Sequence, residues 1–218
     1  MSSEPYDSRT DRLKASPPLF GSPFLDRFTR VHHLVPVVLY GPVVLACVVV
    51  ALSRESQPAV VGYAVVGYLL WTLTEYWLHR IVFHFEPEGG LGARLHFLVH
   101  GVHHDHPNDP KRLVMPPAAS VPLALGFVLL YRWVFGPDAW TAVTAGFLGG
   151  YLVYDELHYY LHHRVPTTAA GRRLRELHMR HHFQDHSTGF GISAPYWDRF
   201  FGTFSRIAER DKPAPEPH

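Results

Sequence analysis

Ten of the seventeen histidines in this sequence fall in four clusters whose spacings suit metal ligation. His158 and His162 lie four residues apart, so on a helix their imidazoles point from one face. Two other stretches, HGVHH and HMRHH, have the i, i+3, i+4 spacing that also fits a single helical face. The candidate metal ligands are His79, His84, His100, His103, His104, His158, His162, His178, His181 and His182.

The pair His79 and His84 has a spacing that a regular helix does not bring together. An i, i+5 pair diverges by about 140° around a helix of 3.6 residues per turn. The two imidazoles therefore converge only if the helix ends, bends or bulges between them. We predict such an irregularity near Phe83.

The number of clustered imidazoles indicates two metal ions, because a structural zinc site uses only four ligands. Imidazole suits iron, copper, nickel and zinc, so ligand type alone does not choose the metal. We expect His32, His33 and His218, which fall in no repeated spacing, to occupy ordinary surface or core positions. The histidines beside the clusters either support a ligand or lie on the surface; they are His96, His106, His163 and His186.

Apolar runs lead directly into these clusters. Leu34 to Leu52 carries no charge over 19 residues, and as a helix it would span roughly 28 Å, about the hydrocarbon thickness of a bilayer. The alternative is a buried helix of a soluble core. After the turn SRESQP, a second run from Ala59 to Leu78 leads into His79 and predicts a hairpin. Glu75, within this run, either orients a ligand or faces the membrane interface.

A second hairpin is predicted from the runs Val121 to Phe135 and Ala139 to Tyr154. Its first run is short for a full span, so we expect it to tilt or to be partly embedded, with Tyr131 and Trp133 at the interface. Its second run leads into Asp155, which shares a helical face with the histidines that follow. The predicted fold is all-α: an integral-membrane four-helix bundle of two hairpins, with a histidine-rich cap.

Charge indicates the orientation of this bundle. The turns away from the histidines hold only Arg54 and Arg132. The basic residues on the histidine side are Arg80, Arg94, Lys111, Arg112, Arg164, Arg172, Arg173, Arg175 and Arg180. The positive-inside rule therefore predicts a multi-pass protein with the histidine clusters and both termini in the cytoplasm. The net charge of +1, without a basic tract, argues against nucleic acid as a partner.

The two ends of the chain are polar and rich in proline. We expect residues 1–30 to be a lead-in that packs little and is not a signal peptide, because the first apolar run begins near Val31. Residues 206–218 are expected to form a disordered tail. The single cysteine, Cys47, provides neither a disulfide framework nor a cysteine zinc site.

Five motifs together resemble the fatty acid hydroxylase and sterol desaturase superfamily, and most closely its fatty acid 2-hydroxylases. They are HRIVFH, HGVHHDHP, YDELHYYLHH, ELHMRHH and GFGISAPYWDRFFGTF, within roughly residues 70–205. The resemblance implies a membrane hydroxylase domain over residues 31–205, with a centre of two iron ions on a cytosolic cap. Zinc is an alternative occupant in purified protein. The ten clustered histidines match the family's ligands, and Tyr154 and Asp155 match positions beside its active site.

The family's chemistry implies O2-dependent hydroxylation of a lipid, with 2-hydroxylation of a fatty acyl chain as the leading reaction. One oxygen atom enters a C–H bond and the other leaves as water. The 218 residues contain no haem-binding HPGG motif, so we expect a separate electron donor, either cytochrome b5-like or a ferredoxin with its reductase. The glycine-rich aromatic motif could cover the metal site or lie at the lipid headgroups.

Two alternative functions remain open from the sequence. One is a sterol or carotenoid oxidase of the same superfamily, which differs in the shape of its substrate pocket. The other, from a different class, is a membrane metal-binding or transport protein. A transporter needs polar ligands inside its spans, whereas these histidines cluster beyond the predicted helix ends.

Overall fold

The computed structural model describes residues 6–85 and 87–205, and all regular secondary structure within them is helical. The all-α prediction is therefore confirmed. The elements are α1 (Arg9–Lys14), α2 (Pro23–Arg27), α3 (Leu34–Arg54), α4 (Gln57–Trp77), the π-helix η1 (Leu78–Phe83), α5 (Gly90–His96), the π-helix η2 (Phe97–Gly101), α6 (Val102–Asp105), α7 (Pro117–His163), α8 (Ala169–Phe183) and α9 (Tyr196–Phe200).

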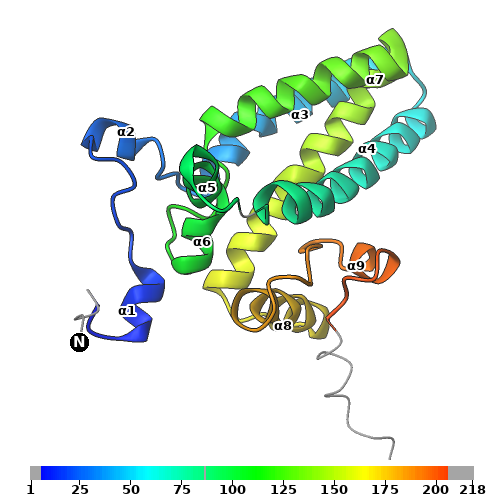
Figure 1. Cartoon of the computed structure of the whole chain (residues 1–218). Helices are drawn as coiled ribbons and strands as arrows, with labels where there is room; N and C mark the ends of the chain where they lie inside the picture. Colours follow the sequence, from blue (N-terminus) through cyan, green and yellow to red (C-terminus); the bar gives the residue numbers. More distant parts are fainter. Residues whose placement is uncertain (1–5, 86, 206–218) are drawn as a thin grey trace, which may run out of the picture.

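The long element α7 is two helices joined by a sharp break. Gly136 has φ 71° and ψ −176°, a backbone conformation that favours glycine, and the chain reverses there (Figure 1). Helix 117–135 and helix 137–163 thus form the predicted second hairpin. The first of them begins at Pro117, earlier than the predicted Val121, because proline is well tolerated in the first turn of a helix. The run is therefore longer than the sequence suggested.

The long helices cross at unusually short distances. A Cβ atom added to Gly146 of α7 would lie 1.9 Å from the carbonyl oxygen of Ala64 in α4. One added to Gly67 of α4 would lie 2.0 Å from the carbonyl oxygen of Val143. Glycine at these positions lets the two backbones touch, as small residues do where membrane helices pack. The crossing fixes α4 against the second half of α7, and both of these helices lead into histidines.

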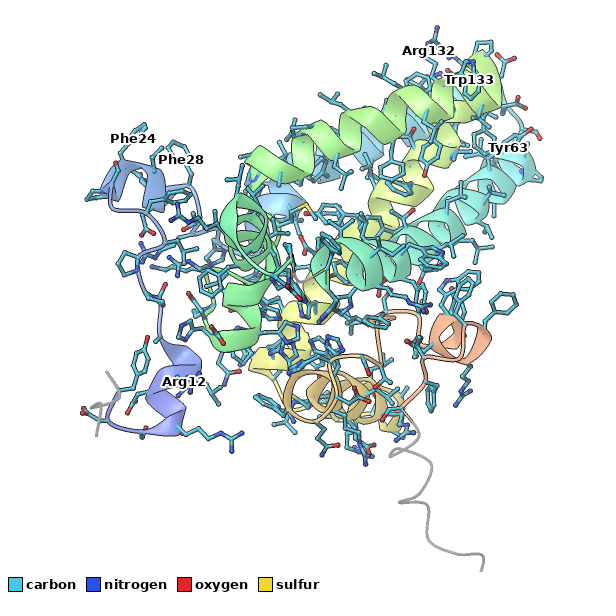
Figure 2. The ribbon with its side chains drawn as sticks, in the orientation of Figure 1. Arg12, Phe24, Phe28, Tyr63, Arg132 and Trp133 are labelled. Carbon is cyan, nitrogen blue, oxygen red and sulfur yellow. The ribbon has the colours of Figure 1, made fainter. Side chains whose placement is uncertain are left out.

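Aromatic side chains fill the centre of the bundle. Tyr131 is buried, with its ring centroid 5.1 Å from that of Phe147. The prediction that Tyr131 lies at the membrane interface is wrong, because its face of helix 117–135 packs against helix 137–163. Trp133 is 80% exposed and lies beside Arg132 at the tip of the hairpin, far from the cap (Figure 2). The predicted place of Trp133 at the membrane interface stays a prediction.

Apolar side chains also cover the outside of the bundle. Of the described helices, α3 and α7 are long and apolar enough to cross a membrane, by length and composition. Val38, Leu45 and Leu129 are each at least 65% exposed. Exposure of so many large apolar side chains is unfavourable in water and suits a lipid environment. These features are those of a membrane protein.

The N-terminal segment packs more closely than the sequence suggested. Asp26 of α2 is 3% exposed, accepts a hydrogen bond from the Leu19 N–H at 2.7 Å, and pairs with Arg112 at 3.3 Å. The backbone of Val31 donates to the Lys111 carbonyl oxygen at 2.7 Å. The described residues up to 30 are mostly exposed, as expected, but a buried ion pair at Asp26 anchors the segment to residues 106–112. The predicted disordered tail, residues 206–218, lies outside the described residues.

Candidate metal centre

The ten predicted ligands converge at one end of the helix bundle. They come from η1 and the residue after it, from η2 and α6, from the end of α7 and from α8, elements that Figure 1 shows in the lower part of the molecule. They form two groups of five, and the candidate ligand atoms within each group lie within 4.8 Å of one another. We call them the outer group and the inner group, because two members of the first are half-buried whereas all five of the second are buried. The outer group is His79, His84, His100, His104 and His181; the inner group is His103, His158, His162, His178 and His182.

Each HxxHH motif is divided between the two groups. His100 and His104 join the outer group while His103 joins the inner one. In the second motif His178 and His182 join the inner group, and the middle histidine, His181, joins the outer. The spacing of each triplet fits a single helical face and so suggested a single site. The structure instead divides each triplet between the two groups. Each group thus combines a histidine pair from the end of a long helix with the first and last histidines of one HxxHH motif. The fifth member is the middle histidine of the other HxxHH motif.

The predicted irregularity between His79 and His84 is present as the π-helix η1. The His84 N–H donates to the His79 carbonyl oxygen at 3.1 Å, which is the i to i+5 bond of a π-turn. This wider turn superposes residues five apart, and it brings the two Nε2 atoms to 3.1 Å. The prediction of a helical irregularity near Phe83 is confirmed.

The ring nitrogens are arranged as metal ligands are. The Nε2 atoms of His100 and His104 are 2.9 Å apart, and those of His162 and His178 are 2.7 Å apart. Adjacent nitrogens bound at 2.0–2.1 Å to one ion would be separated by roughly 3 Å. Among the described residues, both ring nitrogens of His103, His158 and His182 are buried without a hydrogen-bond partner.

Such orphaned polar atoms are rare in proteins, and all three residues belong to the inner group, where a bound metal ion would satisfy them.

Electrostatics keep these imidazoles in the form that binds metal. Burial, reinforced by neighbouring imidazoles, lowers the pKa of His84 and His103 to about 3. Burial also lowers the pKa of His181 to about 4, and the pKa values of the other seven fall below the ordinary value for the same reason. All ten are therefore neutral at pH 7, with lone pairs available for an ion.

Two outer ligands are oriented by backbone carbonyls. His79 Nδ1–H donates to the Phe190 carbonyl oxygen at 2.7 Å, and His181 Nδ1–H donates to that of Thr188 at 2.7 Å. A carbonyl only accepts, so in both rings Nδ1 carries the proton and Nε2 is left for the ion. The segment 187–194, which runs into the glycine-rich aromatic motif, thus sets the direction of two ligands. The Phe190 ring also covers His79, His84 and His181, with centroid distances of 5.5–5.8 Å.

Two buried carboxylates hold this segment in place. Asp198 accepts hydrogen bonds from the N–H groups of Phe190 and Gly191, both at 2.8 Å. Glu75 of α4 accepts from the N–H of Ser193 at 2.7 Å and from its hydroxyl. Glu75, whose role the sequence left open, therefore acts on the ligands through the segment. Asp198 was not predicted; the only signal was an acidic residue within an otherwise aromatic and glycine-rich motif.

Tyr154 and Asp155 lie beside the inner group on α7. The Tyr154 ring is stacked near His158, with a centroid distance of 5.7 Å. Asp155 is 1% exposed, yet among the described residues no hydrogen bond joins it to any of the ten imidazoles. Its Oδ2 atom and the hydroxyl of Tyr151, one turn earlier, are both buried without a hydrogen-bond partner among the described residues. The predicted role of Tyr154 and Asp155 in catalysis stays a prediction.

The histidines outside the two groups have varied positions. His96 Nε2–H donates to the Phe83 carbonyl oxygen at 2.7 Å and so supports the end of η1. His106 Nδ1–H donates to the Arg12 carbonyl oxygen at 2.6 Å, which ties α1 to the cap. His33 contacts Glu156 at 3.0 Å. His186 is exposed, next to the outer group, while His218 lies outside the described residues.

An apolar cleft lies inside the bundle close to the inner group. It is bounded by α4 and both halves of α7, and its lining includes Trp71, Ala124, Phe147 and Tyr151. The Trp71 ring lies 5.6 Å from that of Tyr154, which in turn stacks near an inner ligand. One aromatic ring, that of Tyr154, thus separates this cleft from the inner group.

Comparison with known proteins gives a uniform result. The profile of the family described as fatty acid hydroxylase matches residues 64–203, which include all ten histidines. Dihydroceramide fatty acyl 2-hydroxylase FAH1 of Arabidopsis thaliana is 39% identical over 191 residues, 87% of this chain and 81% of the plant protein. Ceramide very long chain fatty acid hydroxylase SCS7 of Saccharomyces cerevisiae is 42% identical over 198 residues, 88% of this chain and 50% of the yeast protein.

A solved structure shares the fold. It is described as full-length scs7p with only the hydroxylase domain visible, and it superposes with a TM-score of 0.83 at 39% sequence identity. The match covers 93% of this chain and 76% of that chain.

Proposed function

We propose that this chain, which belongs to the fatty acid hydroxylase family, is an O2-dependent membrane enzyme that 2-hydroxylates a fatty acyl chain. The observation that carries the proposal is the convergence of ten neutral imidazoles into two five-membered groups at the end of apolar helices. Relatives named for dihydroceramide and ceramide substrates support an acyl chain of a sphingolipid or a free fatty acid as the substrate.

The proposed metal is iron, held as one ion in each group. Hydroxylation of an unactivated C–H bond requires redox chemistry, which zinc lacks, and imidazole is a suitable ligand for iron. Bound iron would supply the chemistry that uses O2 and two electrons, with one oxygen atom leaving as water. We propose that the electrons come from a separate carrier protein, cytochrome b5-like or a ferredoxin with its reductase.

The residues of the chain would position the substrate and exclude water. The apolar cleft beside Trp71 and Phe147 suits the hydrocarbon chain, because its lining offers few polar atoms. Tyr154 lies between the cleft and the inner group, where it would fix the position of the reacting carbon. We propose that Asp155, buried behind it, orients Tyr151 or a bound water rather than a ligand directly.

The proposed topology has four membrane crossings, made by α3, α4 and the two halves of α7, with the metal groups and both termini in the cytoplasm. Arg54 donates a hydrogen bond to the Pro137 carbonyl oxygen at 2.8 Å, so the turns of the two hairpins lie together at the end opposite the cap. These turns carry few basic residues, which supports their place outside the cytoplasm. Single cysteines at Ser56 and Ser187, both exposed, in a Cys47→Ser background test it. Labelling of Ser56→Cys from the cytoplasmic side would overturn this orientation.

The function is tested by lipid analysis of cells that express the protein, grown under 18O2. We expect a 2-hydroxylated acyl product that carries the label, and its loss in His158→Ala because the inner group then lacks a ligand. His32→Ala is the control, since that exposed ring lies in neither group. Product without label, or full activity in His158→Ala, would refute the hydroxylase. An oxidised sterol or carotenoid in place of an acyl product would favour the alternative oxidases.

A further inference from the structure

The two histidine groups differ in their access to solvent. Every ligand of the inner group is buried, whereas His84 and His104 of the outer group are half-buried. Their rings lie 4.9 Å apart, so the opening is a single face of the outer group rather than two separate gaps. An ion in the outer group would therefore have an exposed side, and an ion in the inner group would have none.

An eleventh histidine stands at this opening. The His186 ring lies 4.9 Å from that of His104 and 6.0 Å from that of His181, although His186 belongs to neither group. It is exposed and follows the C-terminus of α8, in a turn where Asp185 accepts hydrogen bonds from the N–H and the hydroxyl of Ser187. The turn holds an imidazole at the solvent side of the outer group, within reach of an ion that enters or leaves.

The inner group lies behind the outer one. The His104 ring is stacked on that of His182, with a centroid distance of 4.3 Å and an interplanar angle of 27°. His103, the inner ligand adjacent in sequence, is buried among His158, His162 and His182 at centroid distances of 4.7–4.8 Å. Release of an inner ion thus requires the cap to open or the outer ligands to move aside.

We propose that the two ions exchange independently, with the outer one passing through the face lined by His84, His104 and His186. His186 acts there as a transient ligand for a divalent transition-metal ion, binding the ion before the outer group does and after it is released. The inner ion stays in place during this exchange. This inference rests on the proposed function only in that each group holds one ion, and it concerns metal exchange rather than catalysis.

The test is release of metal from full-length protein in detergent, loaded with two Zn2+ per chain and mixed with an excess of a coloured chelator. We expect two phases of equal amplitude, one ion leaving fast and one slowly. In His186→Ala the fast phase, and the reloading of that ion, should both slow, because the ion then crosses the opening without a transient ligand; a common slowing of both directions leaves the affinity unchanged. His186→Cys should restore much of the rate, because a thiolate also binds these ions. His32→Ala should match the unsubstituted protein.

The fast phase is assigned with His84→Ala, which removes an outer ligand and should leave only the slow phase. A single phase for both ions, or loss of the slow phase in His84→Ala, would overturn the proposal. So would unchanged fast kinetics in His186→Ala. Two separate phases without lipid hydroxylation would refute the proposed function alone, whereas labelled product with single-phase release would refute this inference alone.

Discussion

Replacement of Asp198 by alanine tests whether the aromatic segment orients the outer ligands. Asp198 is 1% exposed, and Asp198→Ala leaves the N–H groups of Phe190 and Gly191 without their acceptor. Each unsatisfied buried group costs about 1–3 kcal/mol, so the segment loses about 2–6 kcal/mol. That is a large part of the roughly 5–15 kcal/mol that stabilises a typical domain, and local rearrangement is the expected response.

The rearrangement moves the carbonyl groups of Thr188 and Phe190, which accept hydrogen bonds from the outer ligands His181 and His79. No carbonyl of this segment accepts a hydrogen bond from a described inner ligand. Loss of such partners typically weakens metal binding 10 to 100-fold, or about 1.4–2.7 kcal/mol. Asp198→Ala should therefore lose one ion per chain in a titration with a competing chelator, and its thermal unfolding midpoint should fall. Asp198→Asn keeps one acceptor oxygen and should be intermediate. Asp138→Ala, an exposed carboxylate at the far tip, is the control.

Retention of both ions at unchanged affinity in Asp198→Ala would refute this reasoning. A selective loss of the inner ion would refute it equally, because the hydrogen bonds of the segment reach only the outer group.

Three further predictions concern packing, substrate length and pH. Gly146→Leu should destabilise the fold by about 3 kcal/mol or more, because the new side chain meets the α4 backbone, whereas Gly149→Leu, with no atom within 4 Å of an added Cβ, should change the thermal midpoint little. Ala124→Phe should narrow the cleft and shift the hydroxylated products toward shorter acyl chains; an unchanged length distribution would argue against the cleft as the acyl site. Metal-free protein should lose stability as pH falls from about 6.5 toward 4, since unfolded histidines then take up protons that the buried imidazoles, such as His181, do not. Calorimetry from pH 5 to 8 measures this, and a midpoint independent of pH below 6.5 would contradict it.

Local periodicity is what made the candidate ligands predictable. The spacing of His158 and His162 identifies a shared helical face without any tertiary information. The five-residue spacing of His79 and His84 required a departure from the α-helix, and the π-helix η1 provides it. The apolar runs gave most ends of the long helices within a few residues, but the last helix continues past Tyr154 to His163 because the polar histidine face extends it.

What could not be predicted depends on contacts distant in sequence. The division of each HxxHH motif arises because α6 and α8 approach each other with both groups between them, and no local pattern encodes that approach. The role of Asp198 depends on backbone N–H groups, which every sequence has. Tyr131 resembles an interfacial residue by type, but its burial is decided by the partner helix across the hairpin.

The division of the HxxHH motifs also has a topological consequence. Each bound ion would tie the chain segment 100–104 to the segment 178–182, and so both ions would close the same large loop. Closing a loop removes conformational entropy from the open chain, but a second link across the same points removes little more. Departure of one ion would therefore leave the loop closed by the other. Either ion alone is thus enough to link segment 100–104 to segment 178–182. Only loss of both ions would return the conformational entropy of the loop between them.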